Sequence, residues 1–197
     1  MIQFPDIEPD AATFSIQANT TSFESELNAS VQHASMPGDK WIFTLTFTNR
    51  ARQDGRKLAA WLAALGGPTG RFEMSPPDLD QQGTLSGAGI VDGAGQTGST
   101  LNTTGWTVNQ SALAVAGDYI TVNGELKMIT ADAASDANGD AVLSIAPPLR
   151  KSPANGASIT VDNPKGKFYL VDDNQAAWRL SAPYIYAISF AGEEDVV

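Results

Sequence analysis

The clearest pattern in the chain is an alternating apolar and polar segment, Trp41–Thr48, followed at once by a helical repeat. Large apolar side chains occupy its odd positions, and threonines most of its even ones. This period of two predicts a strand with one buried face. The next stretch, 52–65, predicts the only good helix, because it spaces apolar residues along one face: Leu58, Trp61, Leu62 and Leu65. Gly66-Gly67-Pro68 predicts its end, and extended sequence resumes at Arg71–Met74.

Alternation recurs on both sides of this unit. Residues 12–33 predict two strands, with a half-buried pattern in which five residues alternate with polar ones: Phe23, Ser25, Leu27, Ala29 and Val31. Met36–Asp39 predicts a turn into the Trp41 strand. Tyr184, Tyr186, Ile188 and Phe190 alternate near the C-terminus, and we expect this strand to pair with the early ones.

The amino-acid composition changes in the middle of the chain. Gln81–Gly105 is rich in glycine, serine and threonine. Asn123-Gly124 is a strong hairpin signal, because both turn residues must take positive φ. It lies between Tyr119–Val122 and Glu125–Ile129. Two further Asn-Gly pairs, at 138–139 and 155–156, precede Ala141–Ala146 and Ser158–Val161. Four such strands predict a small barrel or sandwich.

The predicted fold class is therefore mainly β, a β-sandwich or barrel with one α-helix, plus an inserted small β-barrel or OB-like domain. The outer domain comprises residues 1–80 and 166–197, contains the helix at about 52–65 and is closed by Phe168–Val171 and the terminal strands. The insertion comprises residues 81–165.

Composition favours a protein that works in an assembly. Of 197 residues, 17% are charged, a low share that suits a surface partly buried between subunits. The net charge is −10, which argues against nucleic-acid binding across the chain. Four basic residues at the helix start predict a solvated face or contacts to an acidic neighbour: Arg50, Arg52, Arg56 and Lys57. Acidic residues near both ends predict solvated tails: Asp6, Glu8, Asp10, Glu193, Glu194 and Asp195.

The sequence contains no cysteine, which excludes disulfides, thiolate nucleophiles and thiolate metal sites. The N-terminal residues lack the basic start and apolar run of a signal peptide. The longest apolar stretch, around Leu58–Leu65, is too short to span a bilayer. We expect a protein that is soluble when made and has no membrane partner.

Two glycine-rich motifs resemble ligand loops but lack the required context. Gly93–Gly98 has the glycine spacing of a dinucleotide-binding loop, yet no helical periodicity follows it; a flexible or surface loop is favoured. Asp136–Asp140 resembles part of a calcium loop, but Ala141–Pro148 supplies no carboxylate. A hairpin turn is the preferred interpretation.

The remaining candidates for catalysis are isolated. Asp78 with Asp80, and Asp172 with Asp173, could be imagined as paired carboxylates; turns are the preferred interpretation of both. His33 is the only histidine, so a histidine metal cluster is impossible, and no Gly-x-Ser-x-Gly elbow accompanies it; we expect a residue at a strand end. The sequence therefore predicts no enzyme, catalytic residue, cofactor or metal.

Several motifs, in their order, resemble the distal tail proteins of long-tailed, siphovirus-type bacteriophages. They run from about residue 35 to 191: Pro37–Trp41, Ala59–Leu62, Gly67–Phe72, Asp92–Gly98, Gly117–Ile120, Pro147–Arg150, Asn163–Phe168 and Tyr186–Phe190. The resemblance implies a structural virion protein that forms a ring, commonly hexameric, at the distal end of the tail tube. Its partners would be copies of itself, the tube protein and the hub or fibre protein of the tail tip.

The resemblance also implies that the outer domain continues the tube, that a barrel-like insertion decorates it, and that DNA passes through the lumen without specific binding. The protein would reside in the virion tail tip or baseplate, and in the host cytoplasm during assembly. The alternative is a carbohydrate-binding module that recognises host surface glycan through exposed aromatics, for which the candidates are Trp106, Tyr119 and Trp178. A cell-wall hydrolase is a third, less favoured hypothesis.

Overall fold

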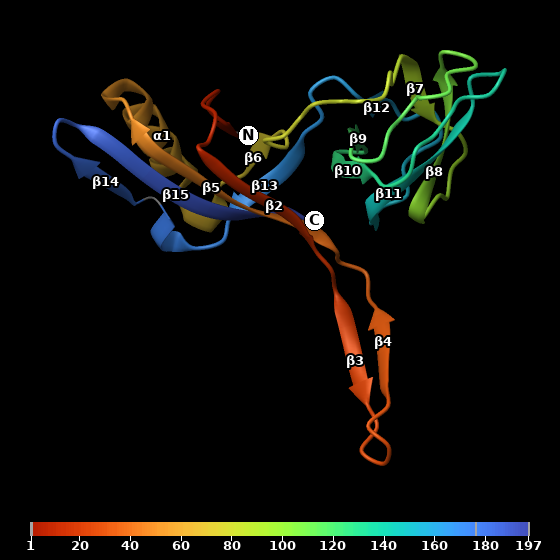
Figure 1. Ribbon diagram of the computed structural model, residues 1–197, viewed down its shortest axis with the longest axis horizontal. Coiled ribbons are helices and arrows are strands. Elements are labelled where there is room, and N and C mark those ends of the chain that lie inside the picture. The colour runs from red at the N-terminus through yellow and green to blue at the C-terminus, as the bar shows by residue number, and fades with distance from the viewer. Residues whose placement is uncertain (1, 176, 197) are drawn as a thin grey trace.

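Within residues 2–175 and 177–196, which the computed structural model describes, the chain forms a seven-stranded sheet, a six-stranded sheet and a separate two-stranded hairpin. We call them the platform, the barrel and the arm. The arm projects away from both sheets (Figure 1). The mainly β fold class with a barrel is confirmed, and α1 (Arg52–Leu65) is the only α-helix in this described part.

The platform combines early and late segments of the chain. Its strand order is β1–β6–β13–β15–β5–β2, and β14 also pairs with β15. The bounds are β1 Ile2–Gln3, β2 Ala11–Gln17, β5 Lys40–Arg50, β6 Phe72–Met74, β13 Gly166–Leu170, β14 Trp178–Ser181 and β15 Ile185–Glu194. The predicted pairing of the C-terminal strand with an early strand is confirmed, because β15 runs antiparallel to β5.

The platform core is built from aromatic rings on the apolar face of β5. Phe43 meets Phe168 edge-on at 5.3 Å between ring centroids, and Phe47 stacks on Phe190 at 5.9 Å. Helix α1 covers this face with its predicted apolar stripe, all of it buried. Gly55 of α1 lies so close to Tyr186 that a Cβ there would overlap the tyrosine ring. Gly66 ends the helix in the left-handed conformation, at φ 66°.

The barrel has the strand order β12–β9–β10–β11–β8–β7. A bridge between Ile90 and Ser158 brings the two edges of this sheet together. The bounds are β7 Gly87–Val91, β8 Gly98–Trp106, β9 Tyr119–Val122, β10 Glu125–Ile129, β11 Ala141–Leu149 and β12 Ile159–Thr160. Its core is largely aliphatic, with Leu101, Ile120 and Leu143 fully buried. Asn123 and Gly124 take φ of 52° and 76°, so the predicted β9–β10 hairpin is confirmed.

The two sheets also touch. Leu126 of β10 belongs to the platform core, and the indole Nε1 of Trp41 donates to its carbonyl at 3.0 Å. Strands β7–β12 lie within the predicted insertion, residues 81–165; these domain boundaries stay a prediction.

Two connections are 3₁₀ turns, η1 (Gly67–Thr69) and η2 (Asp173–Gln175).

The prediction of a half-buried strand at residues 23–31 was wrong. This stretch is the tip of the arm, in which β3 (Thr20–Glu24) pairs with β4 (Val31–Ser35). Leu27 is 98% exposed and Phe23 62% exposed. The alternating residues Ser25, Leu27 and Ala29 lie in the turn, which is closed by hydrogen bonds between Ser25 and Ser30 and between Ala29 and Ser25. Alternation predicted a strand here, but a tight turn interrupts it.

The expectation of solvated acidic tails was wrong for the C-terminal residues Glu193, Glu194 and Asp195, whereas Asp6, Glu8 and Asp10 are exposed. Glu194 is 1% exposed and pairs with Arg150 at 2.5 Å. Glu193 pairs with Lys40, and Asp195 pairs with Arg71 at 2.8 Å. Asp10 pairs with Arg50 at 2.8 Å, a contact of the predicted kind between the basic cluster and an acidic neighbour. The C-terminal acids therefore fasten the end of β15 instead of extending into water, and Asp10 is ion-paired although it stays exposed.

Candidate assembly surfaces

The dinucleotide-like motif is the connection between two barrel strands. Gly93–Gly98 joins β7 to β8, and no helix begins after it. The Gln96 amide holds this loop, donating to the Asp92 carbonyl at 2.7 Å and accepting from the Asn102 amide at 2.6 Å. The loop lies between two strands, and the amide of Gly93 donates to Asn155 at 2.8 Å, so it offers no helix N-terminus to a phosphate.

The calcium-like motif is a turn, as the sequence predicted. Asp136 accepts from the backbone amides of Asp140 at 2.9 Å and Asn138 at 2.8 Å. These bonds stabilise the carboxylate and hold the pKa of Asp136 below its usual value. Across residues 2–175 and 177–196, no group of three or more His, Asp or Glu side chains could hold a metal ion.

The other polar candidates do not converge. Asp80 accepts from Gln82 at 2.9 Å, and Asp172 accepts from the amide of Asn174 at 3.0 Å, so both carboxylates serve local turns. His33 lies in the middle of β4, not at its end, and its Nδ1 is 2.8 Å from the hydroxyl of Ser22. Both residues are exposed on the arm, where nothing shields the pair from water.

The aromatic residues proposed for glycan binding have different environments. The expectation of an exposed Trp106 was wrong: it is 4% exposed and its indole donates to Thr103 at 2.7 Å. Tyr119 is half-buried against Trp41, at 5.9 Å between centroids, and this burial raises the pKa of its hydroxyl. Trp178 is 48% exposed, but it belongs to the platform edge and not to the barrel.

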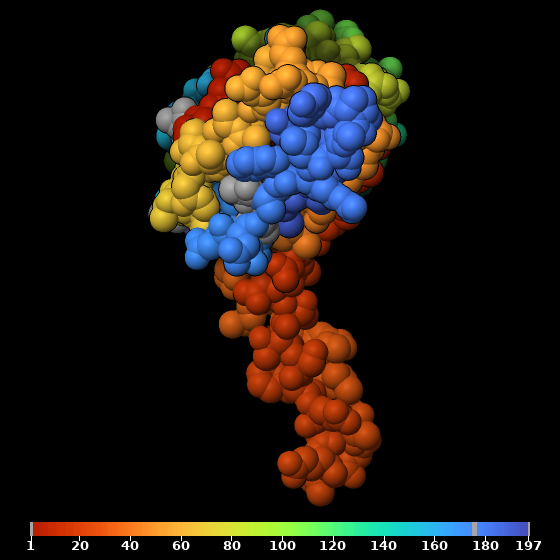
Figure 2. Space-filling view, turned by 90° about the vertical axis from the view of Figure 1, so that its left-hand side faces the viewer, coloured from red at the N-terminus to blue at the C-terminus, as the bar shows by residue number. Residues whose placement is uncertain are grey.

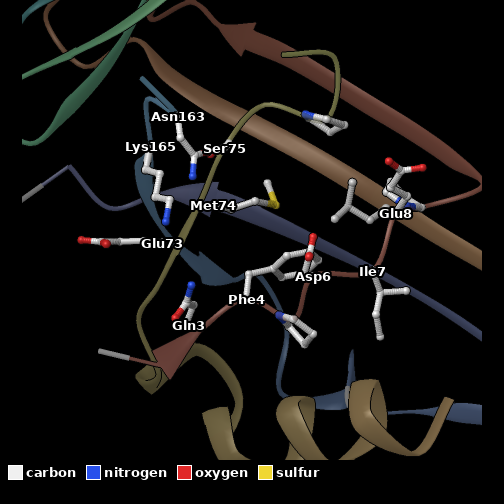
Figure 3. A pocket seen from close by; sticks show the side chains of 14 residues that line it. Gln3, Phe4, Asp6, Ile7, Glu8, Glu73, Met74, Ser75, Asn163 and Lys165 are labelled. Atoms are coloured by element: carbon white, nitrogen blue, oxygen red, sulfur yellow. The ribbon is translucent and has the colours of Figure 1, made fainter. Parts of the chain in front are cut away.

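A pocket of about 420 Å³ lies where the N-terminal segment crosses the platform. Phe4 and Met74 lie at its centre, with Asn163 and Lys165 on one side and Glu8 among the residues on the other (Figure 3). Its lining has neither histidine nor cysteine, and both Asp6 and Glu8 are exposed to water. Glu73 and Lys165 also line it, so the pocket has acidic and basic groups but no histidine.

The arm presents apolar side chains that nothing in the described chain covers. All of β3 is exposed, and the arm forms a narrow projection below the body of the molecule (Figure 2). Besides Phe23 and Leu27, Val31 next to the tip and Met36 at the base are each 49% exposed. The arm contains Glu24 and Glu26, whereas no lysine or arginine precedes Lys40 in the sequence. It is an apolar and acidic projection.

A second apolar surface lies at the opposite corner of the platform. Trp178, Leu180 and Tyr184 are 48%, 50% and 57% exposed; we call them the shelf. Trp178 lies directly opposite the buried Ile188 in the sheet, so both project from the face that α1 covers. The turn between β14 and β15 lies beside α1 (Figure 2), and Arg52 of the helix lies over the Tyr184 ring at 4.9 Å.

The shelf is bordered by positive charge. Arg56 on α1 is exposed, and Arg52 lies over Tyr184; Arg179, which is paired with Ala187 on β15, projects from the other face of the sheet. Lys57 is 3.8 Å from Asp54 on the same helix, so part of its charge is compensated. The shelf thus has the apolar character of the arm and the opposite charge.

The other face of the platform is rich in hydroxyl groups. Five residues form this hydroxyl face: Thr13, Ser15, Thr44, Thr46 and Ser189. Thr46 and Ser189 hydrogen-bond to each other at 3.1 Å. At one end of this face, Lys40 is paired with Glu193, which also accepts from the Tyr169 hydroxyl at 2.9 Å.

No helix in the described residues is long and apolar enough to cross a membrane. In comparisons with known proteins, neither a protein-family model nor a curated protein matches this chain.

Proposed function

We propose that this protein is a structural subunit of a bacteriophage tail, which assembles with its own copies into a closed ring, hexameric by resemblance, at the distal end of the tail tube. The ring would connect the tube to the tail-tip hub and fibre, and DNA would pass through its lumen. The family resemblance supplies this identity. The observation that supports it most directly is the uncovered arm.

The arm and the shelf lie at opposite corners of one sheet. The arm continues from β2 and β5, and β2 is the last strand of the platform order, with no further strand on its outer edge in the described chain. The shelf belongs to β14 and the start of β15. If the arm of one copy covers the shelf of the next, every copy uses two different surfaces. Such a head-to-tail interface forms a closed ring when the rotation between copies closes.

The arm and the shelf are also complementary in apolar character and in charge. Burial of the exposed Phe23 and Leu27 against the apolar shelf would stabilise the association of neighbouring copies, because burial of apolar area is its main favourable term. The acidic residues Glu24 and Glu26 would approach the arginines around the shelf, and complementary charges fix orientation and partner choice.

The hydroxyl face suits the wall of a DNA channel. DNA affinity comes largely from lysine and arginine contacts to phosphate. Hydroxyl groups predominate where β2, β5 and β15 form this face, and Lys40 is paired with Glu193; the exposed Arg179 lies at its β14 edge. DNA would therefore slide past it without being held. With α1 covering the opposite face of the sheet, the helix would lie on the outside of the ring.

The test is assembly of the purified chain. Sedimentation velocity and negative-stain electron microscopy at high concentration should show closed rings. The double variant Phe23→Ser/Leu27→Ser should weaken association by at least about tenfold, equivalent to about 1.4 kcal/mol, without changing the circular dichroism spectrum. Val142→Ser is the matched control, since Val142 is 59% exposed on the barrel and lies on neither surface.

A wild-type chain that stays monomeric and forms no ring would overturn the proposal, as would a double variant that assembles normally. Immunogold labelling of tailed particles that contain this chain should place it at the distal tip. No observation favours the glycan-binding alternative, because Trp106 lies in the barrel core.

A further inference from the structure

Four charged side chains meet where the barrel joins the platform. Glu125 and Lys127 come from β10, Arg150 follows β11, and Glu194 ends β15. Their side chains are 10%, 0%, 16% and 1% exposed, respectively. Two cations and two anions make this junction cluster neutral, as groups removed from water require.

Within the cluster, the Arg150–Glu194 pair links the two sheets, whereas the Lys127–Glu125 pair lies within β10. Lys127 Nζ lies 2.7 Å from Glu125 and also donates to the Pro148 carbonyl at 2.9 Å. Arg150 makes two contacts to Glu194, at 2.5 and 3.0 Å. The fork of the guanidinium fits a carboxylate in one orientation, so it fixes an angle as well as a distance.

Arg150 also reaches the base of the arm. Its Nη1 donates to the carbonyl of Asp39 at 3.1 Å. The Asp39 carboxylate in turn accepts from the amide of Asn19 at 2.8 Å, and the Asn19 side chain donates to the Pro37 carbonyl at 2.8 Å. Asn19 and Pro37 lie in the two connections that join the arm to β2 and β5. One side chain therefore contacts barrel, platform and arm base.

We propose that Arg150 is a mechanical joint that couples the direction of the arm to the position of the barrel. Buried ion pairs add little net stability, because desolvation offsets their attraction, but they can specify one arrangement over others. If the barrel shifts, the Arg150 guanidinium moves with it and pulls on Asp39, which anchors both connections of the arm. On the proposed function, a tail component that binds the barrel would thereby alter the contact between neighbouring subunits.

The absence of cysteine makes the geometry directly measurable. Cysteines introduced in pairs at exposed positions of the arm (Gln32), barrel (Ala137) and helix (Ala63) can carry spin labels for pulsed electron paramagnetic resonance. Labelled protein diluted into unlabelled protein reports distances within one subunit. The measurement therefore succeeds whether or not rings form, and its failure is distinct from failure of the proposed function.

Wild-type protein should give a single narrow distance distribution for the arm–helix and barrel–helix pairs. Arg150→Met should cause loss of the narrow peak for both pairs. Arg150→Lys keeps the charge without the fork, and should broaden both pairs even if Arg150→Met does not fold. Lys57→Met is the matched control, because it removes an exposed ion pair on α1, and both peaks should stay narrow.

Two outcomes would overturn the inference. In the first, folded Arg150 variants retain wild-type distributions for both pairs, which means that the cluster does not set the geometry. In the second, only the barrel–helix distribution broadens, which means that the strand connections alone direct the arm.

Discussion

The arm and the barrel are both built from short strands with tight turns, yet only the barrel closes over its apolar side chains. In the barrel, Leu101, Ile120 and Leu143 are fully buried. In the arm, Phe23 and Leu27 extend into solvent, and a two-stranded hairpin alone is marginally stable. The difference teaches that alternation in a sequence indicates a strand but does not reveal what covers it. An apolar hairpin with no covering element indicates a partner outside the subunit.

The largest predicted effect is on the free energy of unfolding, which should depend on apolar side chains of the barrel and not on those of the arm. Leu143→Ala should lower the free energy of unfolding by about 2–5 kcal/mol, because it leaves a cavity in a core that cannot collapse fully. Leu27→Ala removes the same atoms from a side chain that is 98% exposed and should change stability by no more than about 0.5 kcal/mol. Urea denaturation of dissociated protein measures both. Equal losses would show that the arm packs on its own subunit.

A second prediction concerns the platform, whose helix packs through a glycine. Gly55→Ala would ordinarily favour a helix, but the new methyl would overlap the ring of Tyr186. We expect a net loss of about 1–3 kcal/mol from overpacking, measured by the same denaturation. Ala60→Gly is a useful comparison, since Ala60 is exposed on the same helix and should lose only about 1 kcal/mol of helix propensity. A stabilised Gly55→Ala variant would disprove the close packing.

Sequence patterns that extend over only a few residues predicted the helix and several strands correctly. Apolar spacing predicted α1, alternation predicted β5, and Asn123-Gly124 predicted the β9–β10 hairpin. Strands β7 and β8 were missed, because glycines and threonines dominate them and few large apolar residues mark their buried face: Val91, Leu101 and Trp106. Small residues suit a strand whose neighbours come too close for larger ones: a Cβ at Gly89 would overlap Trp106.

The candidate surfaces could not be predicted in the same way, because exposure depends on contacts between distant segments. Glu194 resembled a tail residue until β15 placed it beside Arg150, 44 positions away. Trp178 is marked by the sequence only as an aromatic candidate for glycan binding. The register of β14 with β15 is what shows that Trp178 and Leu180 extend the buried face beyond α1. The sequence of the arm predicts a half-buried strand for the complementary reason, since it does not show that nothing folds back onto residues 20–35.

Charge reversal sharpens the comparison between arm and shelf. Glu26→Lys should weaken association, because it brings a cation toward Arg52, which lies over the Tyr184 ring of the shelf, and Arg52→Glu alone should do the same. The double variant should regain part of the loss, with a coupling of about 0.2–1 kcal/mol, as exposed pairs show. Sedimentation equilibrium at two salt concentrations measures it, and higher salt should reduce the coupling. Strictly additive single effects would place these residues at separate sites.

The smallest effect concerns acid stability, in which the platform and arm should again differ. Hydrogen bonding from Lys40, helped by Tyr169, holds the pKa of Glu193 below its usual value of 4.5. A carboxylate whose pKa is lowered by folding stabilises the native state above its unfolded pKa, and this contribution is lost as pH falls through the folded value. Glu193→Gln should therefore lower stability at neutral pH, and the difference from wild type should shrink below pH 4.5.

Glu24→Gln provides the control, because it changes a carboxylate on the exposed arm that has no described hydrogen-bond or ion-pair partner. Its unfolding curve should follow that of the wild type from neutral pH down to acid pH. Thermal unfolding of dissociated protein across this range compares the three chains. A Glu193→Gln variant that keeps a constant deficit at all pH values would show that the lost contact acts through packing and not through charge. If Glu24→Gln alters the acid transition instead, the arm must fold against its own subunit in solution, and the contrast between a covered platform and an uncovered arm would fail.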